Sequence, residues 1–345
     1  MSDLPQTMTA ILQTGDGYSG KAEGPAIADA AEYLETATIP VPTPKKGQVL
    51  IKLRVASVNP SDLHFIKGEY GQPRFKGTPA GFEGCGDVVA AGEGAEALMG
   101  QRVSFVAGRP DHSGAWAEYA LTEAQMCIPL RPDVSDVDAS AQIVNPMTAM
   151  AMIEIADQAG DAVVISAATS QLGKLMISLA RDRGLKSIAL VRRAEAVEPL
   201  KALGADEVLV TTDADILDQF TAASKALKPI VFLDAVSDQL SEKLFVAMPT
   251  GARWVSYGKL NSELPQLTQM GQLIFMSKQI EGFWLTRWMM TTPPAEQAKV
   301  VGEVQARFAD GRWKTDVAAT LPLAEVVSGL AAALKKTDGK VVITP

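Results

Sequence analysis

Two adjacent arginines, Arg192 and Arg193, follow shortly after a turn of small residues at 168–173 that ends on Gly173. Paired guanidinium groups bind phosphate through charge-assisted hydrogen bonds. Units that bind NAD usually place an acid about 20 residues after such a turn, where it binds the ribose 2′-hydroxyl, whereas the first acid here is Glu195. The arginines therefore suit a 2′-phosphate, as in NADPH. The alternative is a solvated basic pair at the end of a strand.

The residues around this turn predict a strand–helix–strand unit. Residues 162–167 form an apolar run rich in β-branched side chains, which is typical of a strand buried on both faces. Apolar residues recur at helical spacing over 172–180, Arg183–Gly184 is a stop signal, and 187–191 predict a second strand. In such a unit a dinucleotide's pyrophosphate lies on the N–H groups that begin the helix. The residues placed to bind it are Thr169, Ser170, Gln171 and Leu172.

The glycine pattern by itself leaves an alternative open. Only Gly173 remains of the usual glycine-rich fingerprint, so a parallel βαβ unit without a cofactor is also compatible with it. Glutamine at position 171 would leave side chains, rather than a close backbone approach, to supply donors to the pyrophosphate.

Composition bounds the possibilities further. The 345 residues are enough for two domains of ~150 residues each, and 47% hydrophobic with 21% charged residues is ordinary for a globular protein. The 32 basic and 40 acidic residues give a net charge of −8, which disfavours nucleic acid or an anionic membrane surface as a partner. Any anionic ligand must then meet a local basic patch.

Three features predict a cytoplasmic protein without a membrane segment or targeting peptide. The chain has only two cysteines, Cys85 and Cys127, as expected in a reducing compartment. No apolar run reaches the ~18 residues of a membrane span, and the N-terminal region is acidic.

The order of predicted elements indicates two kinds of domain. Short strands between glycine and proline turns fill the first third of the chain, which predicts a compact, partly closed β domain. Within it, Ile39–Pro44 carries three prolines and is predicted to be a rigid extended connector. From about Thr148 onward helices and strands alternate, which predicts a doubly wound parallel sheet. Its six strands are expected at 162–167, 187–191, 207–210, 230–234, 253–257 and 279–285. A closing strand at 340–344 is expected to pair with the N-terminal domain.

This order resembles that of the medium-chain dehydrogenase/reductase superfamily. Four motifs carry the resemblance along nearly the whole chain: Val58–Asp62, Gly81–Gly84, Gly114–Tyr119 and Asp338–Val342. The resemblance implies an α/β fold in which residues 1–144 and 284–345 form a GroES-like catalytic domain, and residues 145–283 form a Rossmann domain that binds NADPH. It also implies a homodimer, which members usually form by edge pairing of their two Rossmann sheets.

Two positions separate this chain from the zinc-dependent members of the superfamily. Those members place a cysteine where Asn59 stands and a histidine where Phe82 stands. Zinc needs three or four nitrogen, sulfur or oxygen ligands, and phenylalanine supplies none. Two cysteines cannot form a four-cysteine structural lobe, and neither lies at ligand spacing from the two histidines, His64 and His112. The sequence therefore predicts a zinc-independent protein with no metal site.

Within the zinc-independent branch, the sequence is most similar to the mitochondrial-type trans-2-enoyl-thioester reductases. The matching segments are 59–62, 68–71, 144–149, 255–258 and 282–288. The resemblance implies an NADPH-dependent reductase of activated C=C bonds, acting on trans-2-enoyl thioesters of CoA or acyl carrier protein. Reduction of quinones, alkenals or other enones is the alternative with the same fold and cofactor. An NADPH-binding protein without enzymatic activity is the alternative from a different class.

The same resemblance implies roles for individual residues. Tyr70 would be catalytic, because a phenol can protonate or hydrogen-bond the enolate left when hydride adds to an α,β-unsaturated carbonyl. The alternative is a turn tyrosine packed at the surface. Asn145 would bond the nicotinamide carboxamide or the enolate oxygen, and would otherwise cap a helix before Pro146. Lys340 would be directed toward the NADPH site, and would otherwise be solvated.

Two strand ends complete the expected cofactor site, because ligands bind at the carboxyl edge of such sheets. Tyr257 and Gly258 end the predicted fifth strand, and Phe283, Trp284 and Leu285 end the sixth. These residues are placed to line the nicotinamide and acyl pocket, although aromatic residues at strand ends are more often part of the core.

Overall fold

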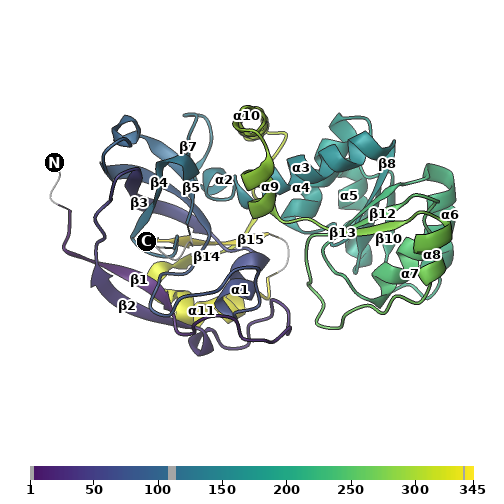
Figure 1. Cartoon of the computed structure of the whole chain (residues 1–345), viewed down its shortest axis with the longest axis horizontal. Helices are drawn as coiled ribbons and strands as arrows, with labels where there is room; N and C mark the ends of the chain where they lie inside the picture. The colour runs from purple at the N-terminus through teal and green to yellow at the C-terminus, as the bar shows by residue number, and fades with distance from the viewer. Residues whose placement is uncertain (1–3, 108–113, 337–338) are drawn as a thin grey trace. The chain divides into compact units, whose positions relative to one another are not determined.

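The computed structural model describes residues 4–107, 114–336 and 339–345, so His112 and Asp338 lie outside the described residues. The chain forms two compact units, coloured in chain order in Figure 1: unit 1 comprises residues 1–144 and 305–345, and unit 2 comprises residues 145–304. The first boundary coincides with the predicted one. The return to unit 1 comes at Gln305 rather than at 284, because two helices that follow the last strand belong to unit 2 up to Val304.

Unit 2 is built on one parallel sheet, with strands in the order β10-β9-β8-β11-β12-β13. The strands are β8 (Ala162–Ile165), β9 (Lys186–Val191), β10 (Glu207–Val210), β11 (Val231–Asp234), β12 (Arg253–Ser256) and β13 (Gln279–Gly282). Numbered along the chain, this order is that of a dinucleotide-binding sheet. The predicted doubly wound sheet is therefore confirmed.

Helices cover this sheet, and two of them extend past the boundaries of unit 2. They are α3 (Val144–Ala159), α4 (Gln171–Asp182), α5 (Val197–Leu203), α6 (Ile216–Leu227), α7 (Gln239–Ala247), α8 (Met270–Phe275), α9 (Leu285–Thr291) and α10 (Pro294–Ala309). Phe220 of α6 and Phe245 of α7 belong to one apolar cluster with Phe232 and Trp254 of the sheet. Burial of such large side chains holds the helices against the strands.

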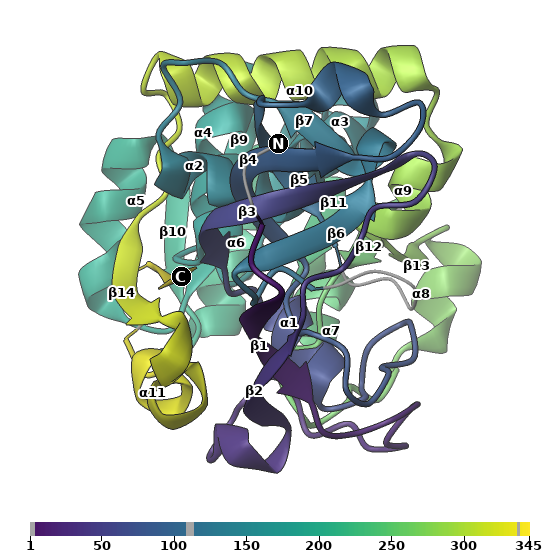
Figure 2. The same cartoon turned by 90° about the vertical axis from the view of Figure 1, so that its left-hand side faces the viewer.

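Unit 1 contains a seven-stranded sheet in the order β14-β15-β3-β4-β5-β7, with β6 beside β3, and a separate two-stranded sheet β1–β2. The strands are β1 (Thr7–Gln13), β2 (Leu34–Pro40), β3 (Gln48–Ser57), β4 (Glu83–Ala91), β5 (Arg102–Val106), β6 (Tyr119–Glu123), β7 (Cys127–Pro129), β14 (Val317–Pro322) and β15 (Lys340–Thr344). Figure 2, in which this unit faces the viewer, shows the long β3 crossing the sheet. Because β15 pairs with β14 and β3, the expected pairing of the closing strand is confirmed.

The helices of unit 1 are α1 (Pro60–Ile66), α2 (Asp136–Ser140) and α11 (Val326–Ala333). Leu63 and Ile66 of α1 and Leu330 of α11 pack into the same core as β3, β4 and β5. None of the helices in the described ranges is long and apolar enough to cross a bilayer.

One element differs from its prediction. The segment predicted as an extended connector, Ile39–Pro44, begins inside β2, which pairs with β1 through the partners Thr7 and Pro40. Proline has no N–H for the ladder, so it is tolerated at a strand end in a small sheet. The prolines therefore mark the end of a strand, and only the residues after Pro40 form the connector.

Candidate active site

The turn after β8 is closed tightly against the first turn of α4. Ser170 is the N-cap residue, and its hydroxyl accepts a hydrogen bond from the Gly173 N–H at 3.0 Å. Ala167 adopts a left-handed φ of 46°, and a Cβ on Gly173 would lie 2.6 Å from the carbonyl oxygen of Ala168. Gly173 therefore permits the close packing of strand and helix, the role of the last glycine in a dinucleotide fingerprint.

The four residues predicted to bind a pyrophosphate lie together at this turn. Thr169 and Ser170 precede α4, Gln171 and Leu172 begin it, and all four are half-buried. The N-terminus of α4, a helix of 12 residues, carries partial positive charge and N–H donors that suit an anion. The turn thus fits a dinucleotide, while its contact with one stays a prediction.

Arg192 and Arg193 follow directly on β9, and both are exposed. The backbone here is tied to the segment after β10: the Thr211 N–H donates to the Val191 carbonyl at 2.7 Å, and the Thr212 hydroxyl donates to the Arg192 carbonyl at 3.3 Å. Because β9 is the neighbour of β8, both arginines and the α4 turn lie at the carboxyl edge of the same sheet. This donor set fits a dinucleotide that carries a further phosphate on its ribose.

Asp234, the last residue of β11, organises the middle of this edge. Its buried carboxylate accepts hydrogen bonds from the Ser166 hydroxyl at 2.6 Å, the Trp254 indole N–H at 2.9 Å and the backbone N–H groups of Val236 and Ser237 at 2.9 and 3.1 Å. Burial raises the pKa of Asp234, and the hydrogen bonds oppose that shift. The carboxylate therefore fixes the ends of β8, β11 and β12 relative to one another.

Tyr257 and Gly258 follow β12 at the same edge, as predicted. The Tyr257 N–H donates to the Asp234 carbonyl at 2.9 Å, and a Cβ on Gly258 would lie 2.8 Å from the Ala235 carbonyl oxygen. The Tyr257 hydroxyl is buried without a hydrogen-bond partner among the described residues, and burial together with the charge of Asp234 raises its pKa. This tyrosine is therefore held as a neutral phenol.

The predictions for Phe283, Trp284 and Leu285 need correction. The strand β13 ends at Gly282, Trp284 is the N-cap residue of α9, and Leu285 is the first residue of that helix. Phe283 alone continues the edge, its N–H donating to the Ser256 carbonyl at 2.9 Å. Trp284 is 37% exposed, so it is not a core residue of unit 2 either.

Asn145 also differs from its expected place. The helix α3 begins at Val144 rather than at Thr148, so Asn145 is its second residue. It is half-buried and does not occupy the capping position that was the alternative to a cofactor contact.

In unit 1, Tyr70 lies a few residues beyond α1, in an aromatic group. Its ring centroid is 5.3 Å from that of Phe82 and 6.4 Å from that of Phe65, and the Phe65 and Phe82 rings are 4.9 Å apart. Tyr70 is half-buried, whereas Phe65 and Phe82 are buried. Two apolar rings therefore fix one side of the phenol that the sequence predicts to be catalytic.

Lys340, the first residue of β15, is buried and donates a hydrogen bond to the side-chain carbonyl of Asn59. The Asn59 side-chain N–H₂ donates to the Glu83 carboxylate at 2.8 Å, and its backbone N–H donates to Asp62 at 2.7 Å. Lys340 thus has partners inside unit 1, rather than the solvated position that was its alternative. Its contact with a cofactor stays a prediction.

Comparison with known proteins matches both units. The family model described as "Alcohol dehydrogenase GroES-like domain" matches residues 45–132, and "Zinc-binding dehydrogenase" matches residues 172–300. The mitochondrial enoyl-[acyl-carrier-protein] reductase of Arabidopsis thaliana is 31% identical over 278 residues, 78% of this chain and 73% of that protein. The corresponding protein of Caenorhabditis elegans is 30% identical over 322 residues, 90% of each chain. The chain belongs to the medium-chain dehydrogenase/reductase superfamily.

A solved structure places it among the quinone oxidoreductase-like members of that superfamily. The protein, from Mesorhizobium loti and assigned as an NADPH:quinone reductase, is 47% identical, with a TM-score of 0.95 over 99% of both chains. The superfamily, the fold class and the enzyme class predicted from the sequence, an NADPH-dependent oxidoreductase, are therefore confirmed.

In this member of the superfamily, the two zinc-ligand positions have other partners. The Asn59 carboxamide is bonded to Lys340 and Glu83, and the Phe82 ring packs on Tyr70 and Phe65. An ammonium group therefore lies where a metal would need an electron-pair donor. Among the described residues, no group of three or more histidine, cysteine, aspartate or glutamate side chains could hold a metal ion.

This buried cluster holds two acids beside Lys340. Burial raises the pKa of Asp62 to about 7, although hydrogen bonds from the N–H groups of Asn59 and Phe82 lower it. Glu83 accepts four hydrogen bonds, from Ser57, Asn59 and the backbone N–H groups of residues 143 and 144. Every partner of the Glu83 carboxyl is thus a hydrogen-bond donor, as a buried acid requires.

Sequence reasoning missed Asp62, Glu83 and Asp234 as parts of the two units' polar networks. An acid at the last position of an apolar strand, as in Val231–Asp234, could have predicted a buried hydrogen-bond network, because a buried charge needs hydrogen-bond partners. No comparable signal connects Asp62 and Glu83 with Lys340, since their contacts join distant parts of the sequence.

Proposed function

We propose that this protein reduces the activated C=C bond of trans-2-enoyl thioesters of CoA or acyl carrier protein, with NADPH as the reductant. The observation that carries the proposal is Tyr70, a half-buried phenol whose ring packs against Phe65 and Phe82. Two enoyl-[acyl-carrier-protein] reductases at about a third sequence identity support the choice of substrate.

The residues present fit the cofactor. The turn 169–172 at the start of α4 would hold the pyrophosphate, and Arg192 and Arg193 would bind the 2′-phosphate. When bound, NADPH would supply a hydride to the β-carbon of the enoyl group, and the electron pair of the C=C bond would move toward the thioester oxygen. Tyr70 would stabilise the resulting enolate through a hydrogen bond and give its proton to the α-carbon, and water would restore the phenol.

The proposed reaction involves no zinc. The donor set at the zinc-ligand positions does not fit that ion, because Lys340 is hydrogen-bonded to Asn59 and Phe82 offers no ligand atom. A phenol donor at Tyr70 would supply the stabilisation that a metal-bound oxygen receives in the zinc-dependent members.

A second candidate is the reduction of quinones or alkenals. It is favoured by the relative of 47% identity, which is assigned as an NADPH:quinone reductase. Both candidates use the same fold and cofactor, so they differ only in the acceptor.

The experiment that tests the proposal is NADPH oxidation with crotonyl-CoA, a longer trans-2-enoyl-CoA and a benzoquinone, assayed side by side on the same preparation. Preference for a thioester by kcat/KM supports the proposal. Turnover of the quinone alone would move the protein to the second candidate. If none of the three acceptors supports NADPH oxidation, and NADPH still binds in a direct titration, a non-enzymatic binding protein would be favoured.

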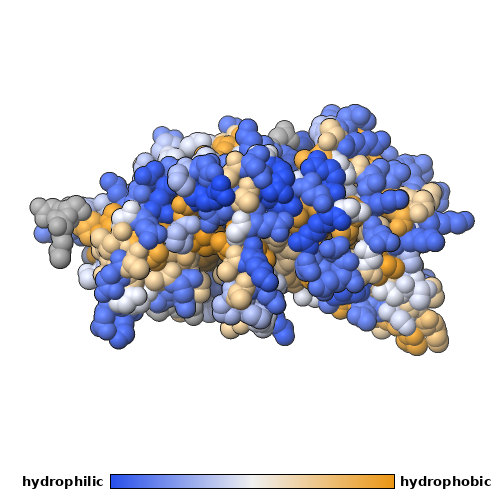
Figure 3. All heavy atoms as spheres, turned by 90° about the horizontal axis from the view of Figure 1, so that it is seen from above, coloured by the Kyte–Doolittle hydropathy of each residue, from blue (hydrophilic) through white to orange (hydrophobic). Residues whose placement is uncertain are grey.

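We further propose that the protein is a homodimer paired at β13. This strand is the last of the described sheet of unit 2, so one side of its backbone lacks a neighbouring strand. In Figure 3, apolar residues gather at the lower right, on the same side of the picture as α8 in Figure 1. The large apolar residues that are exposed in the segment around α8, residues 264–280, are Leu264, Leu267, Met270, Ile274, Phe275 and Ile280. Large exposed apolar patches mark interaction sites.

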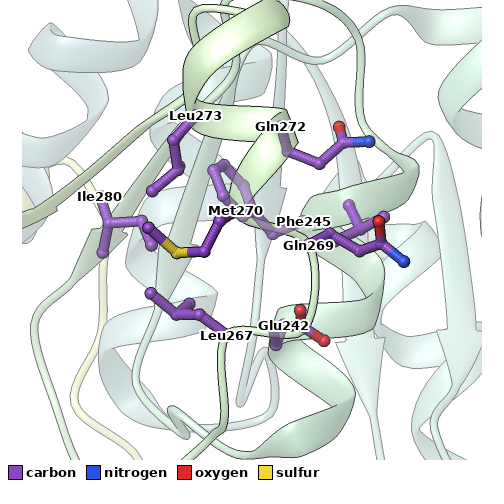
Figure 4. Close-up of a pocket in the computed structure, with 9 residues that line it drawn as sticks. Glu242, Phe245, Leu267, Gln269, Met270, Gln272, Leu273 and Ile280 are labelled. Carbon is purple, nitrogen blue, oxygen red and sulfur yellow. The ribbon is translucent and has the colours of Figure 1, made fainter.

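A small depression lies within the same surface. It is bordered by Phe245 of α7, by Leu267 before α8, by Met270 and Leu273 of α8, and by Ile280 of β13. Figure 4 shows these side chains around it. Its mostly apolar lining supports contact with an apolar surface of a second copy.

We also propose a cytoplasmic location, which the two free cysteines support. Cell fractionation tests this location.

A further inference from the structure

The segment that carries Tyr70 is flanked by charged residues that are almost completely buried. Lys67 is 4% exposed and Glu69 is 8% exposed. Lysine and glutamate are rarely buried unless they are paired, because removing their charge from water costs several kcal/mol. Their partners therefore indicate what this segment is held against.

The Glu69 carboxylate binds the backbone of a loop near the N-terminus. It accepts hydrogen bonds from the N–H groups of Glu23 and Gly24, each at 3.1 Å. The Lys67 ammonium lies 3.6 Å from the same carboxylate, and His64 Nδ1 lies 3.5 Å from it. Two charge-assisted bonds thus fix the residue immediately before Tyr70.

Lys67 holds the same loop from the other direction. Its ammonium donates to the carbonyl oxygens of Gly24 at 2.7 Å and Ala26 at 3.3 Å. Lys67 and Glu69 together therefore bind both the N–H and the C=O groups of loop 23–26. Residues 23–26 are therefore bonded to the segment that carries Tyr70 through both of these side chains.

Arg74 fixes the far end of the segment. Its guanidinium donates to the Ile66 carbonyl at 2.6 Å. The guanidinium carbon, Cζ, also lies close to two glycines: a Cβ added to Gly15 would be 2.3 Å from it, and a Cβ added to Gly68 would be 3.0 Å from it. Gly68 also has a left-handed φ of 72°. Tyr70 is therefore anchored on both sides, between Glu69 and Arg74.

We propose that Glu69 is a positioning residue for Tyr70, which sets the phenol at the place where the enolate forms. The inference rests on the proposed function of Tyr70. Glu69 itself is buried against the loop, so it would act through the backbone of Tyr70 rather than on the substrate. A misplacement of the phenol by about 1 Å would cost on the order of 100-fold in rate.

A double-mutant cycle between Glu69→Gln and Tyr70→Phe tests the proposal. Glutamine keeps the size of the side chain but loses the charge and one acceptor. In the wild-type background we expect Glu69→Gln to lower kcat with crotonyl-CoA at least about tenfold, with the KM for NADPH unchanged, and Glu69→Asp to restore part of the loss. In the Tyr70→Phe background, Glu69→Gln should have no further effect.

Glu118→Gln is the matched control. Glu118 is also in unit 1, and its carboxylate also accepts a backbone N–H, that of Thr9 at 2.6 Å. This variant should retain the wild-type kcat. If Glu69→Gln does not fold, Lys67→Gln breaks the other tie to the same loop and takes its place in the cycle.

A second readout does not depend on turnover. In protein labelled with ¹³C in the tyrosine rings, the Tyr70 signal is assigned by its loss in Tyr70→Phe. We expect Glu69→Gln to shift or broaden it, and Glu118→Gln to leave it in place.

The outcomes separate this inference from the proposed function. A normal kcat and an unmoved Tyr70 signal in Glu69→Gln, or losses that simply multiply in the double variant, would overturn the positioning role while Tyr70→Phe remains slow. If the wild-type protein turned over none of the thioesters, the proposed function would be overturned instead. The NMR comparison would still decide whether Glu69 determines the position of Tyr70.

Discussion

The ammonium of Lys340 donates a hydrogen bond to the side-chain carbonyl of Asn59, across 281 positions of sequence. The pair joins β15, which closes the chain, to the N-cap residue of α1. Burial lowers the pKa of Lys340, while the charges of Glu83 and Asp62 oppose that shift. The cation is thus kept in the core by acids from two other elements.

Removal of this cation should destabilise unit 1. In Lys340→Met the buried acids Glu83 and Asp62 lose the opposite charge that interacts with them, and leaving a buried charge uncompensated costs about 3–5 kcal/mol. The measurement is the midpoint of urea unfolding, compared with Lys335→Met. Lys335 is exposed, so its replacement should change stability by less than about 0.5 kcal/mol. Equal midpoints for the two variants would contradict the role of Lys340.

Asp62 should make stability depend on pH. Its pKa is raised from the ordinary 3.8 to about 7 in the folded protein, so the folded state binds a proton more tightly than the unfolded one. Its stabilising contribution is complete below about pH 4 and is lost as the pH rises through 7. Glu83 and Lys340 lie in the same cluster, and their charges oppose each other in their effect on the pKa of Asp62.

Asp62→Asn isolates this contribution. The amide loses one acceptor for the N–H groups of Asn59 and Phe82, which costs stability equally at every pH. The free energy of unfolding of the variant, relative to that of the wild type, should therefore rise between pH 4 and pH 7. Parallel stability curves for the two proteins across that range would contradict the raised pKa.

The sequence predicted the sheet of unit 2 well, because its central strands β8, β9 and β11 are short apolar runs that are almost entirely buried. The strand expected at 207–210 has those bounds in the structure, and so does the closing strand of unit 1 at 340–344. The prediction failed at residues 283–285, where a local pattern cannot show that Trp284 begins a helix. The return to unit 1 comes at Gln305 rather than at 284, because contacts beyond the local sequence decide that α9 and most of α10 belong to unit 2.

The candidate site was predictable only where its chemistry is local. Arg192 and the α4 turn follow neighbouring strands, so their place at one edge of the sheet follows from the order of the elements. The partners of Lys340 and Glu69 do not. Glu69 binds the N–H of Gly24, 45 positions away, and nothing in either local sequence specifies that contact.

Arg192 and Arg193 should determine the choice between NADPH and NADH. Loss of charge-assisted hydrogen bonds costs about 1.5–3 kcal/mol each, so Arg192→Ala with Arg193→Ala should raise the KM for NADPH by at least about 100-fold. The KM for NADH, which has no 2′-phosphate, should change less than about twofold. Lys201→Ala, at another exposed cation of unit 2, should change neither value. An equal rise in the KM for NADPH and for NADH would contradict this role of the two arginines.

The proposed pairing at β13 should depend on its exposed apolar side chains. Ile280 is 40% exposed, and arginine in its place would put a charge into the interface at a cost of several kcal/mol. Ile280→Arg should therefore convert the dimer to a monomer in sedimentation velocity. Leu217→Arg changes a residue of α6 that is 39% exposed and should stay dimeric. A wild-type protein that sediments as a monomer would refute the pairing outright.

Tyr70→Phe should slow the chemical step without weakening cofactor binding. Phenylalanine keeps the ring packed on Phe65 and Phe82 but lacks the hydroxyl that would donate to the enolate. Loss of one general-acid group typically costs 10²–10⁴-fold in rate, so we expect kcat with crotonyl-CoA to fall about 100-fold or more. The Kd for NADPH, measured by fluorescence titration, should remain at its wild-type value, because the predicted phosphate-binding residues belong to unit 2. If turnover stays unchanged, another group must protonate the product, and Tyr70 keeps only its packing role.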